Sequence, residues 1–213
     1  MRRLRRMPPG RAGRQWLANR LQSAERAADL LDRKLRVLLI DQERFRLLEE
    51  RTRAEWHASW QTADLWILRA AVLGGERDVR LSSPLELADA TISWANVMGV
   101  RYPVEATCEV PELAASHRGP GSTALVEATV AYRQAIRAAV AHAAADAARR
   151  IVEAEIAATR RQLRAITDRW IPMLANASRE LSRELDETER AENFRLRWAA
   201  SSDRRSSMPF GEQ

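Results

Sequence analysis

The sequence predicts a mainly α-helical protein, a long antiparallel two-helix coiled coil with a short β-hairpin-containing insert at one end. Gly and Pro number only 8 each among 213 residues, whereas 46% of the residues are hydrophobic and 30% are charged. That balance is typical of long, solvated amphipathic helices. Two stretches with apolar residues at alternating steps of four and three flank a segment that contains several prolines, which indicates two helices and one insert.

The first predicted helix covers residues 13–75, and between Gly13 and Gly74 it contains neither proline nor glycine. Its heptad seam consists of Leu17, Leu21, Ala24, Ala28, Leu31, Leu35, Leu38, Phe45, Thr52, Trp56, Ala63, Trp66, Ala70 and Leu73. Gln42, Glu49 and Ser59 interrupt the seam. At about 1.5 Å per residue, this helix would be roughly 90 Å long. We therefore expect it to lie along a partner helix.

The predicted insert covers residues 76–121. Gly74 and Gly75 precede it and can end a helix, because glycine adopts the left-handed conformation without steric cost. The insert contains Pro84, Pro103, Pro111 and Pro120. The stretches that favour β-structure are 78–81, 91–97 and 104–110. With Gly99 and Pro103 at turn or bulge positions, we expect a short β-hairpin.

The second predicted helix covers residues 122–198. Ser122 or Thr123 can cap its first turn. Its seam consists of Val152, Ile156, Thr159, Leu163, Ile166, Trp170, Met173 and Ala177. Pro172 should bend the helix or shift its local hydrogen bonds. Because only a short insert separates two long helices, their simplest packing is antiparallel.

The two ends of the sequence are predicted to be tails. Residues 1–12 form a basic N-terminal tail, in which the arginines are Arg2, Arg3, Arg5, Arg6 and Arg11. Residues 199–213 are polar and include Arg204 and Arg205. We expect this C-terminal tail to be disordered.

The charge of the chain is positive, with 35 basic against 29 acidic residues and a formal net charge of +6. Such a charge can indicate nucleic acid, an anionic membrane or an acidic partner protein, but the two signs alternate along most of the chain. Cys108 is the only cysteine, which favours a reducing cytoplasm. No apolar run approaches the roughly 20 residues that span a bilayer, and no secretory signal is expected.

The residue types give no support for a catalytic or cofactor site. Lys34, the only lysine, follows Arg33 and not the glycines of a phosphate-binding loop, so we expect no direct nucleotide binding. The histidines are isolated from one another and from Cys108, and they are His57, His117 and His142. We therefore predict no catalytic residue, no cofactor and no metal site.

Three segments, in the same order along the chain, resemble the motifs of one known family. The sharpest is Asn96-Val97-Met98-Gly99-Val100-Arg101-Tyr102-Pro103, which is similar to the pattern Asn-x-Met-Gly-Val-x-x-Pro. Earlier in the chain, Met7-Pro8-Pro9-Gly10-Arg11 and Ala27-Ala28-Asp29-Leu30-Leu31-Asp32-Arg33-Lys34-Leu35 resemble a Pro-Thr-Arg entry and a Leu-Leu-Lys-x-Lys-Arg helix. Pro9-Gly10-Arg11 departs from Pro-Thr-Arg.

The third segment lies in the second predicted helix. It is Glu155-Ile156-Ala157-Ala158-Thr159-Arg160-Arg161-Gln162-Leu163-Arg164-Ala165-Ile166, followed by Ile171-Pro172 and Glu187-Thr188-Glu189-Arg190. Arg164 stands where the motif has Asn, and Thr167 stands where it has Glu. Together the segments resemble the D subunits of V/A-type (archaeal-type and vacuolar-type) ATP synthases and ATPases, over about residues 7 to 198.

This resemblance implies a non-catalytic rotor in the central stalk of an ion-translocating ATP synthase or ATPase. Such a shaft couples rotation of the membrane ring to ATP synthesis or hydrolysis in the ring of A and B subunits. The implied partners are the A and B subunits, the F subunit and a C/d-type subunit at the membrane ring. The implied location is peripheral, at the cytoplasmic face of the membrane, without membrane insertion.

The resemblance and the charge pattern together select candidate coupling or interface residues. They are Arg11, Arg14, Asn96, Met98, Gly99, Val100, Arg101, Pro103, Thr159, Arg160, Arg161 and Arg164.

Three other functions are compatible with parts of the sequence. A generic coiled-coil scaffold would share the heptads, but it does not predict the motif from Asn96 to Pro103. A nucleic-acid-binding coiled coil would fit the pI near 10.7 and would bind in a salt-dependent manner. The γ shaft of an F-type synthase would normally have a larger middle domain than the short insert predicted here.

Overall fold

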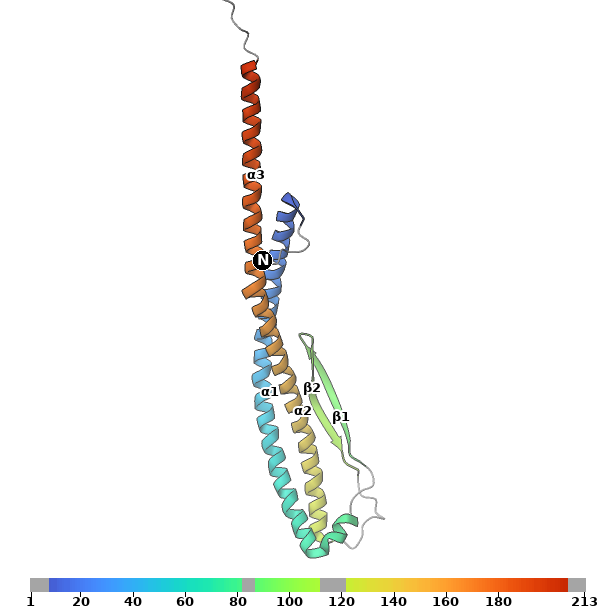
Figure 1. Ribbon diagram of the computed structural model, residues 1–213. Coiled ribbons are helices and arrows are strands. Elements are labelled where there is room, and N and C mark those ends of the chain that lie inside the picture. The colour runs from blue at the N-terminus through green and yellow to red at the C-terminus, as the bar shows by residue number, and fades with distance from the viewer. Residues whose placement is uncertain (1–7, 82–86, 112–121, 207–213) are drawn as a thin grey trace, which may run out of the picture. The chain divides into compact units, whose positions relative to one another are not determined.

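The computed structural model describes residues 8–81, 87–111 and 122–206, with side chains described up to residue 199. Its elements are α1 (Gly10–Leu81), β1 (Asp89–Val97), β2 (Val100–Glu109), α2 (Thr123–Ala165), a π-helical turn η2 (Ile166–Trp170) and α3 (Ile171–Ser206) (Figure 1). The prediction of a mainly α-helical protein with two long helical stretches and a β-hairpin is therefore confirmed. The expected N-terminal arginines up to residue 6, Pro84, His117 and Pro120 lie outside the described residues.

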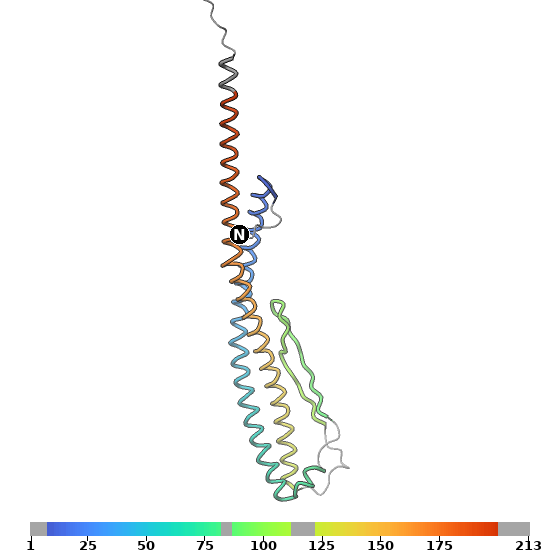
Figure 2. Tube along the Cα trace, in the orientation of Figure 1, coloured from blue at the N-terminus to red at the C-terminus, as the bar shows by residue number. Residues whose placement is uncertain are grey.

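The chain forms two compact units, which are described separately. Unit 1 contains residues 1–33 and 160–213, and unit 2 contains residues 34–159. In unit 2, Ala63 packs with Ala131 and Ala135. Further along α1, Ala70 packs with residues earlier in α2, namely Ala124 and Ala128. Because the residue numbers rise on one helix as they fall on the other, α1 and α2 are antiparallel in this unit (Figure 2).

The heptad seam predicted for the first helix is the buried face of α1 in unit 2 as far as Ala70, but its last predicted residue, Leu73, is 71% exposed. Leu38, Phe45, Ala63 and Ala70 are each at most 3% exposed. Glu49 was expected to interrupt the seam, yet it is buried at a seam position with only 3% of its surface exposed. Burial of a carboxylate among apolar residues requires compensating partners.

The regular part of α1 is interrupted at Gly75, where the sequence predicts a helix stop, but the residues after it differ from the prediction. Gly75 leaves the helical conformation with φ 77° and ψ 162°, but helical residues resume and continue to Leu81. The stretch 78–81, expected to be β-structure, is therefore helical. Packing explains the difference, since Val79 contacts the buried alanines of α1 and α2 at this end of unit 2.

The insert forms a two-stranded antiparallel hairpin, as predicted from its second and third β-favouring stretches. β2 begins earlier than expected, at Val100. The register shifts between Ser93 and Trp94, so that Ser93 pairs with Glu105 and Trp94 with Pro103. Proline cannot donate to the ladder, and a bulge next to it accommodates that loss.

At its start, α2 follows the prediction. The backbone N–H of Leu125 donates to Oγ of Ser122 at 3.3 Å and to the carbonyl oxygen of Ser122 at 2.8 Å. Ser122 therefore caps the helix, which leaves fewer unpaired N–H groups in the first turn.

The predicted seam of the second helical stretch fails at Trp170 and Met173, whereas its last predicted residue, Ala177, packs against the leucine cluster of unit 1. Trp170 and Met173 were expected in the core but are 46% and 39% exposed, whereas Leu174 and Leu181 are buried. The π-helical turn adds one residue to the helix, so the buried position moves from Met173 to Leu174. Pro172 gives a physical reason, because its ring would clash with the carbonyl four residues earlier in a regular helix.

Unit 1 pairs the start of α1 with α3. Leu17 packs with Leu174 and Leu181. α1 begins at Gly10, before the expected start at residue 13, and α3 runs to Ser206. The helix thus continues into the segment 199–213 that was expected to be disordered, and the rest of that segment lies outside the described residues.

Candidate interaction sites

The hairpin is anchored to both helices of unit 2 through its second strand. Val100 and Tyr102 are 6% and 5% exposed and join the buried cluster that includes Leu38 and Val152. The ring of Tyr102 meets that of Phe45 edge-on, with centroids 4.8 Å apart. Aromatic edge contacts of this kind favour one ring orientation. The base of the turn is therefore held in a fixed position on the helices.

The turn of the hairpin presents a small set of exposed side chains. Met98 and Gly99 have φ values of 51° and 79°, and positive φ at both central residues is the mark of a type I′ turn. Glycine adopts this conformation freely, whereas methionine does so at a cost. Met98 is 52% exposed, so burial of its side chain does little to offset the conformational cost.

The candidate side chains of this motif divide into two groups. Asn96, Met98 and Arg101 are exposed, whereas Val100 and Pro103 are buried. The guanidinium carbon of Arg101 lies 4.9 Å from the ring centroid of Trp94, a cation–π contact. Only the exposed group is available to a partner, and the buried group holds the hairpin on the helices.

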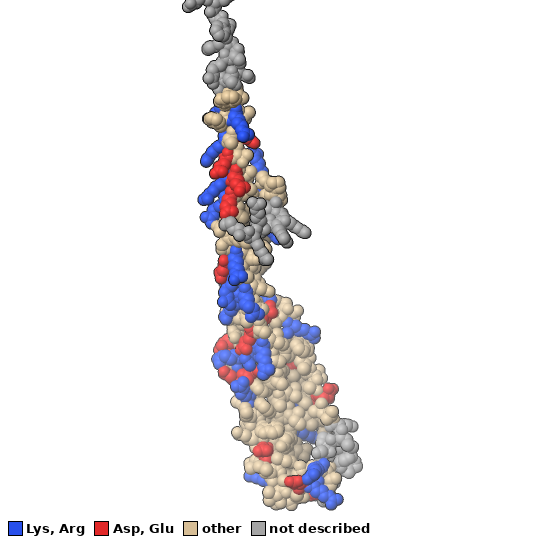
Figure 3. Space-filling model, in the orientation of Figure 1, with Lys and Arg blue, Asp and Glu red and all other residues tan. Residues whose placement is uncertain are grey.

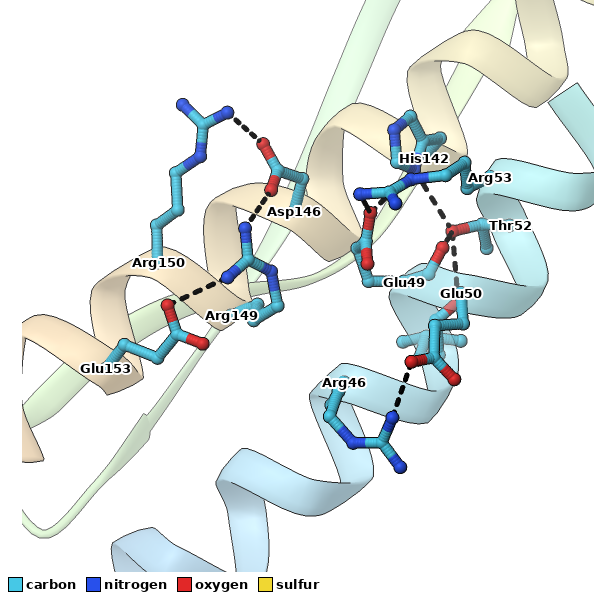
Figure 4. A network of polar contacts seen from close by, with 11 residues as sticks. Arg46, Glu49, Glu50, Thr52, Arg53, His142, Asp146, Arg149, Arg150 and Glu153 are labelled. Carbon is cyan, nitrogen blue, oxygen red and sulfur yellow. Dashed lines mark hydrogen bonds and ion pairs between the residues drawn. The ribbon is translucent and has the colours of Figure 1, made fainter. Parts of the chain in front are cut away.

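A polar cluster interrupts the apolar interface between α1 and α2 (Figure 4). Glu49 forms an ion pair with Arg53, and its Oε1 lies 4.0 Å from Nδ1 of His142. The same buried Oε1 is the atom that contacts Nη2 of Arg53. The ring of Trp56 stacks on His142 with centroids 5.3 Å apart, and Oγ1 of Thr52 lies 3.5 Å from Nδ1 of His142. Sequence reasoning had given Glu49 and His142 no site role, although a carboxylate at a seam position was the available signal.

A second polar network lies on α2. The side chain of Asp146 is 18% exposed, and its carboxylate forms ion pairs with Arg149 at 2.8 Å and Arg150 at 2.6 Å (Figure 4). Burial would raise the pKa of the Asp146 carboxyl, but the hydrogen bond from Arg149 and the charges of both arginines together hold it below its usual value of 3.8. Arg149 also donates to Glu153 at 2.8 Å. The network balances charge at the helix surface and offers no unpaired carboxylate.

The candidate residues near the unit boundary also divide by burial. Thr159, in unit 2, is 1% exposed, and its Oγ1 has no hydrogen-bond partner among the described residues. Arg160, Arg161 and Arg164 are exposed. Nε of Arg164 donates to the carbonyl oxygen of Arg160 at 3.4 Å. Thr159 is therefore a packing residue, and the three arginines are candidates for contact.

The candidate arginines at the start of α1 are exposed as well. Arg11 pairs with Glu189 of α3 at 2.8 Å, with 79% and 51% of the two side chains exposed. Such a surface ion pair contributes little to stability. Arg14 is exposed and lies one helical turn from Arg11. Both side chains can contact a partner at small cost to the fold.

The described residues contain neither a cluster of metal-ligating side chains nor a helix suited to a membrane. No group of three or more His, Cys, Asp and Glu side chains there is placed to hold a metal ion. Among the described helices, none combines the length and the apolar character that crossing a membrane requires.

The paired helices and the anchored hairpin define a coiled-coil protein with a β-hairpin insert. The family model for the ATP synthase D subunit matches residues 15–201, and the chain belongs to this family. It is 27% identical over 195 residues to the D subunit of the A-type ATP synthase of Haloquadratum walsbyi, covering 89% of this chain and 84% of the relative. It is 26% identical over 197 residues to the D subunit of the same type of synthase from Halobacterium salinarum, covering 89% and 87%.

Proposed function

We propose that the chain is the central-stalk rotor subunit of an A-type ATP synthase. In this role it couples rotation of a membrane ring to ATP synthesis or hydrolysis in a ring of A and B subunits. Family membership carries the proposal, because the matched residues 15–201 include both helical stretches and the hairpin. The chain's own part is mechanical, and the chemistry belongs to the nucleotide sites of its partners.

The helix pairing supports a mechanical role. A helix that transmits torque must resist bending, and a single exposed helix gains stiffness when it is packed along a second one. In unit 2, α1 and α2 pack along a buried heptad seam. In unit 1, α1 and α3 pack through a separate leucine cluster. The hairpin adds a third element to unit 2 through Val100 and Tyr102.

The exposed charges support contacts with the catalytic ring. On this proposal Arg11 and Arg14 of α1 face acidic loops of the A and B subunits, and Arg160, Arg161 and Arg164 of α2 contribute to coupling. Exposed guanidinium groups form weak, exchangeable ion pairs, which suits a surface that meets three equivalent partners in turn. The F subunit and a C/d-type subunit at the membrane ring are the proposed partners at the hairpin end.

The coupling itself is conformational. A shaft with different side chains on its different faces makes unequal contacts with identical neighbouring subunits, so each orientation stabilises a different nucleotide-binding state. The proposed location is peripheral, on the cytoplasmic face of the membrane, as part of the complex. The ion that the complex moves follows from the membrane ring and not from this chain.

A test of the proposal changes only the exposed side chains of the hairpin turn. Replacement of Asn96, Met98 and Arg101 by alanine should leave the fold intact but reduce ATP-driven ion uptake into vesicles relative to ATP hydrolysis. Scrambling the whole motif would be less informative, because Val100 and Tyr102 are core residues. The matched control is Ile92→Ala with Val104→Ala, which are 46% and 47% exposed on the same hairpin. Unchanged coupling in the triple variant would contradict the proposed role of the turn.

A further inference from the structure

The π-helical turn between α2 and α3 places exposed arginines in line with an exposed tryptophan and methionine of unit 1. In a regular helix, side chains four residues apart lie above one another, whereas across a π-helical turn the spacing is five. Arg160, Arg164, Arg169 and Met173 follow this rule, with steps of four, five and four. Arg161, Ala165 and Trp170 form the adjacent row by the same rule. We call these seven residues the arginine–tryptophan patch.

The extra residue of the π-helical turn is what creates the patch. Without it, the heptad spacing would place Trp170 and Met173 on the seam, as the sequence predicts, and would place Asp168 in line with Arg164. With it, Leu174 takes the buried position at 1% exposure, and Trp170 and Met173 are 46% and 39% exposed. This local irregularity of the helix thus moves the side chains of Trp170 and Met173 from predicted core positions to the surface.

The patch carries an unbalanced positive charge. Arg160, Arg161, Arg164 and Arg169 are all exposed, and no carboxylate among the described residues pairs with any of them. Asp168 is the only acidic residue within the stretch, and it accepts a hydrogen bond from Thr167 at 3.0 Å. Blue side chains gather beside the junction of α2 and α3 in Figure 3. This differs from unit 2, where Asp146 and Glu153 pair with neighbouring arginines.

The composition is that of an interface centre. Tryptophan, methionine and arginine are the residue types enriched in protein interfaces, and buried tryptophan and arginine dominate their binding energy. A protein segment with carboxylates would pair with the guanidinium groups, which favour bidentate carboxylate contacts. An apolar pocket on the same segment would receive the indole of Trp170.

The surroundings favour a protein over a nucleic acid. Beyond Met173, α3 does not continue the positive surface that a phosphate backbone would follow, because between residues 180 and 192 its arginines alternate with six carboxylates. They are Glu180, Glu184, Asp186, Glu187, Glu189 and Glu192. We propose that the arginine–tryptophan patch binds an acidic protein segment, and that an apolar pocket on this segment receives the indole of Trp170. This inference rests on the proposed function, since the partner is a neighbouring subunit of the complex.

The test uses the complex purified through a tag on the full chain, with p-benzoylphenylalanine in place of Trp170 as a photo-crosslinker. The expected product joins this position to a carboxylate-rich segment of one neighbouring subunit. Arg164→Gln combined with Arg169→Gln should lower the crosslink yield several-fold at low salt and flatten its decline as salt is raised. Arg137→Gln on α2, exposed and outside the patch, should leave the yield unchanged.

A second crosslinking position separates this patch from exposed apolar side chains in general. Phe194 of α3 is 71% exposed, and p-benzoylphenylalanine there should give a different product that is insensitive to the arginine substitutions. Crosslinking of Trp170 to nucleic acid, to a segment without carboxylates or to nothing at all would overturn the inference. If the purified complex lacked the other components of an ATP synthase, the proposed function would fail instead, so the two failures are distinguishable.

Discussion

Asp146 shows how single residues keep a charged helix stable. Two arginines hold its carboxylate, and one of them, Arg149, also holds Glu153. Glu49 differs in burial, because it is almost fully buried and a single arginine, Arg53, contacts its Oε1. At this scale the arginines that the sequence selected as candidates are all exposed, but the sequence did not distinguish Val100 and Pro103 from their exposed neighbours. That distinction depends on which face of the hairpin packs on the helices.

Asp146→Asn should destabilise the chain by about 1 kcal/mol at neutral pH, allowing for solvent screening of the exposed Arg150. Since the folded-state pKa of Asp146 lies below 3.8, its contribution is present above the unfolded-state pKa and is lost as pH falls through the folded-state pKa. The difference from wild type in urea unfolding should therefore shrink below about pH 4. Glu43→Gln, at an exposed pair with Arg46, is the control and should have a smaller effect. An Asp146 effect that persists unchanged at pH 2 would contradict the account.

Met98→Asn should stabilise the hairpin by roughly 0.5 to 1 kcal/mol, because asparagine tolerates the left-handed conformation better than methionine does. Thermal unfolding followed by circular dichroism would measure the change, and Met98→Leu is the control that keeps an apolar side chain. On the proposed function, Met98→Asn should also weaken coupling while it raises stability. A variant that is less stable than wild type would show that the turn is not strained at this residue.

At the scale of the elements, heptad spacing and the positions of glycine and proline predicted both helical stretches and the hairpin. These patterns work because burial of one helix face repeats every seven residues along a coiled coil. They failed at η2, where one added residue changes which side chain is buried without any change in composition. Pro172 was a signal that the local hydrogen bonds shift, but the sequence did not show that a π-helical turn would replace a bend.

The register set by η2 is tested with two adjacent residues. Leu174→Ala should cost about 3 kcal/mol, because Leu174 is 1% exposed and its truncation leaves a cavity. Met173→Ala should cost less than about 1 kcal/mol, because Met173 is partly exposed. Urea unfolding of both variants gives the comparison. Equal losses of stability, or a larger loss for Met173→Ala, would show that the regular heptad continues through η2. The arginine–tryptophan patch would then not form.

At the scale of the whole molecule, the chain consists of two helical units that share α1, and it belongs to the family of ATP synthase D subunits. Sequence motifs predicted this family, because short patterns such as Asn96 to Pro103 combine turn residues with buried anchors in a fixed order. They did not identify the surface that each partner covers, since partner surfaces depend on exposure after folding. The structure adds which candidate residues of the turn are exposed, and it extends the candidate arginines of α2 to the arginine–tryptophan patch.

The most direct test of the rotor proposal is purification of the native complex through a tag on this chain, with identification of its subunits and measurement of ATP hydrolysis. The account predicts that A, B and F subunits are recovered in an active ATPase. Recovery of the chain alone, or bound to nucleic acid, would contradict it and would support a scaffold or a nucleic-acid-binding coiled coil instead.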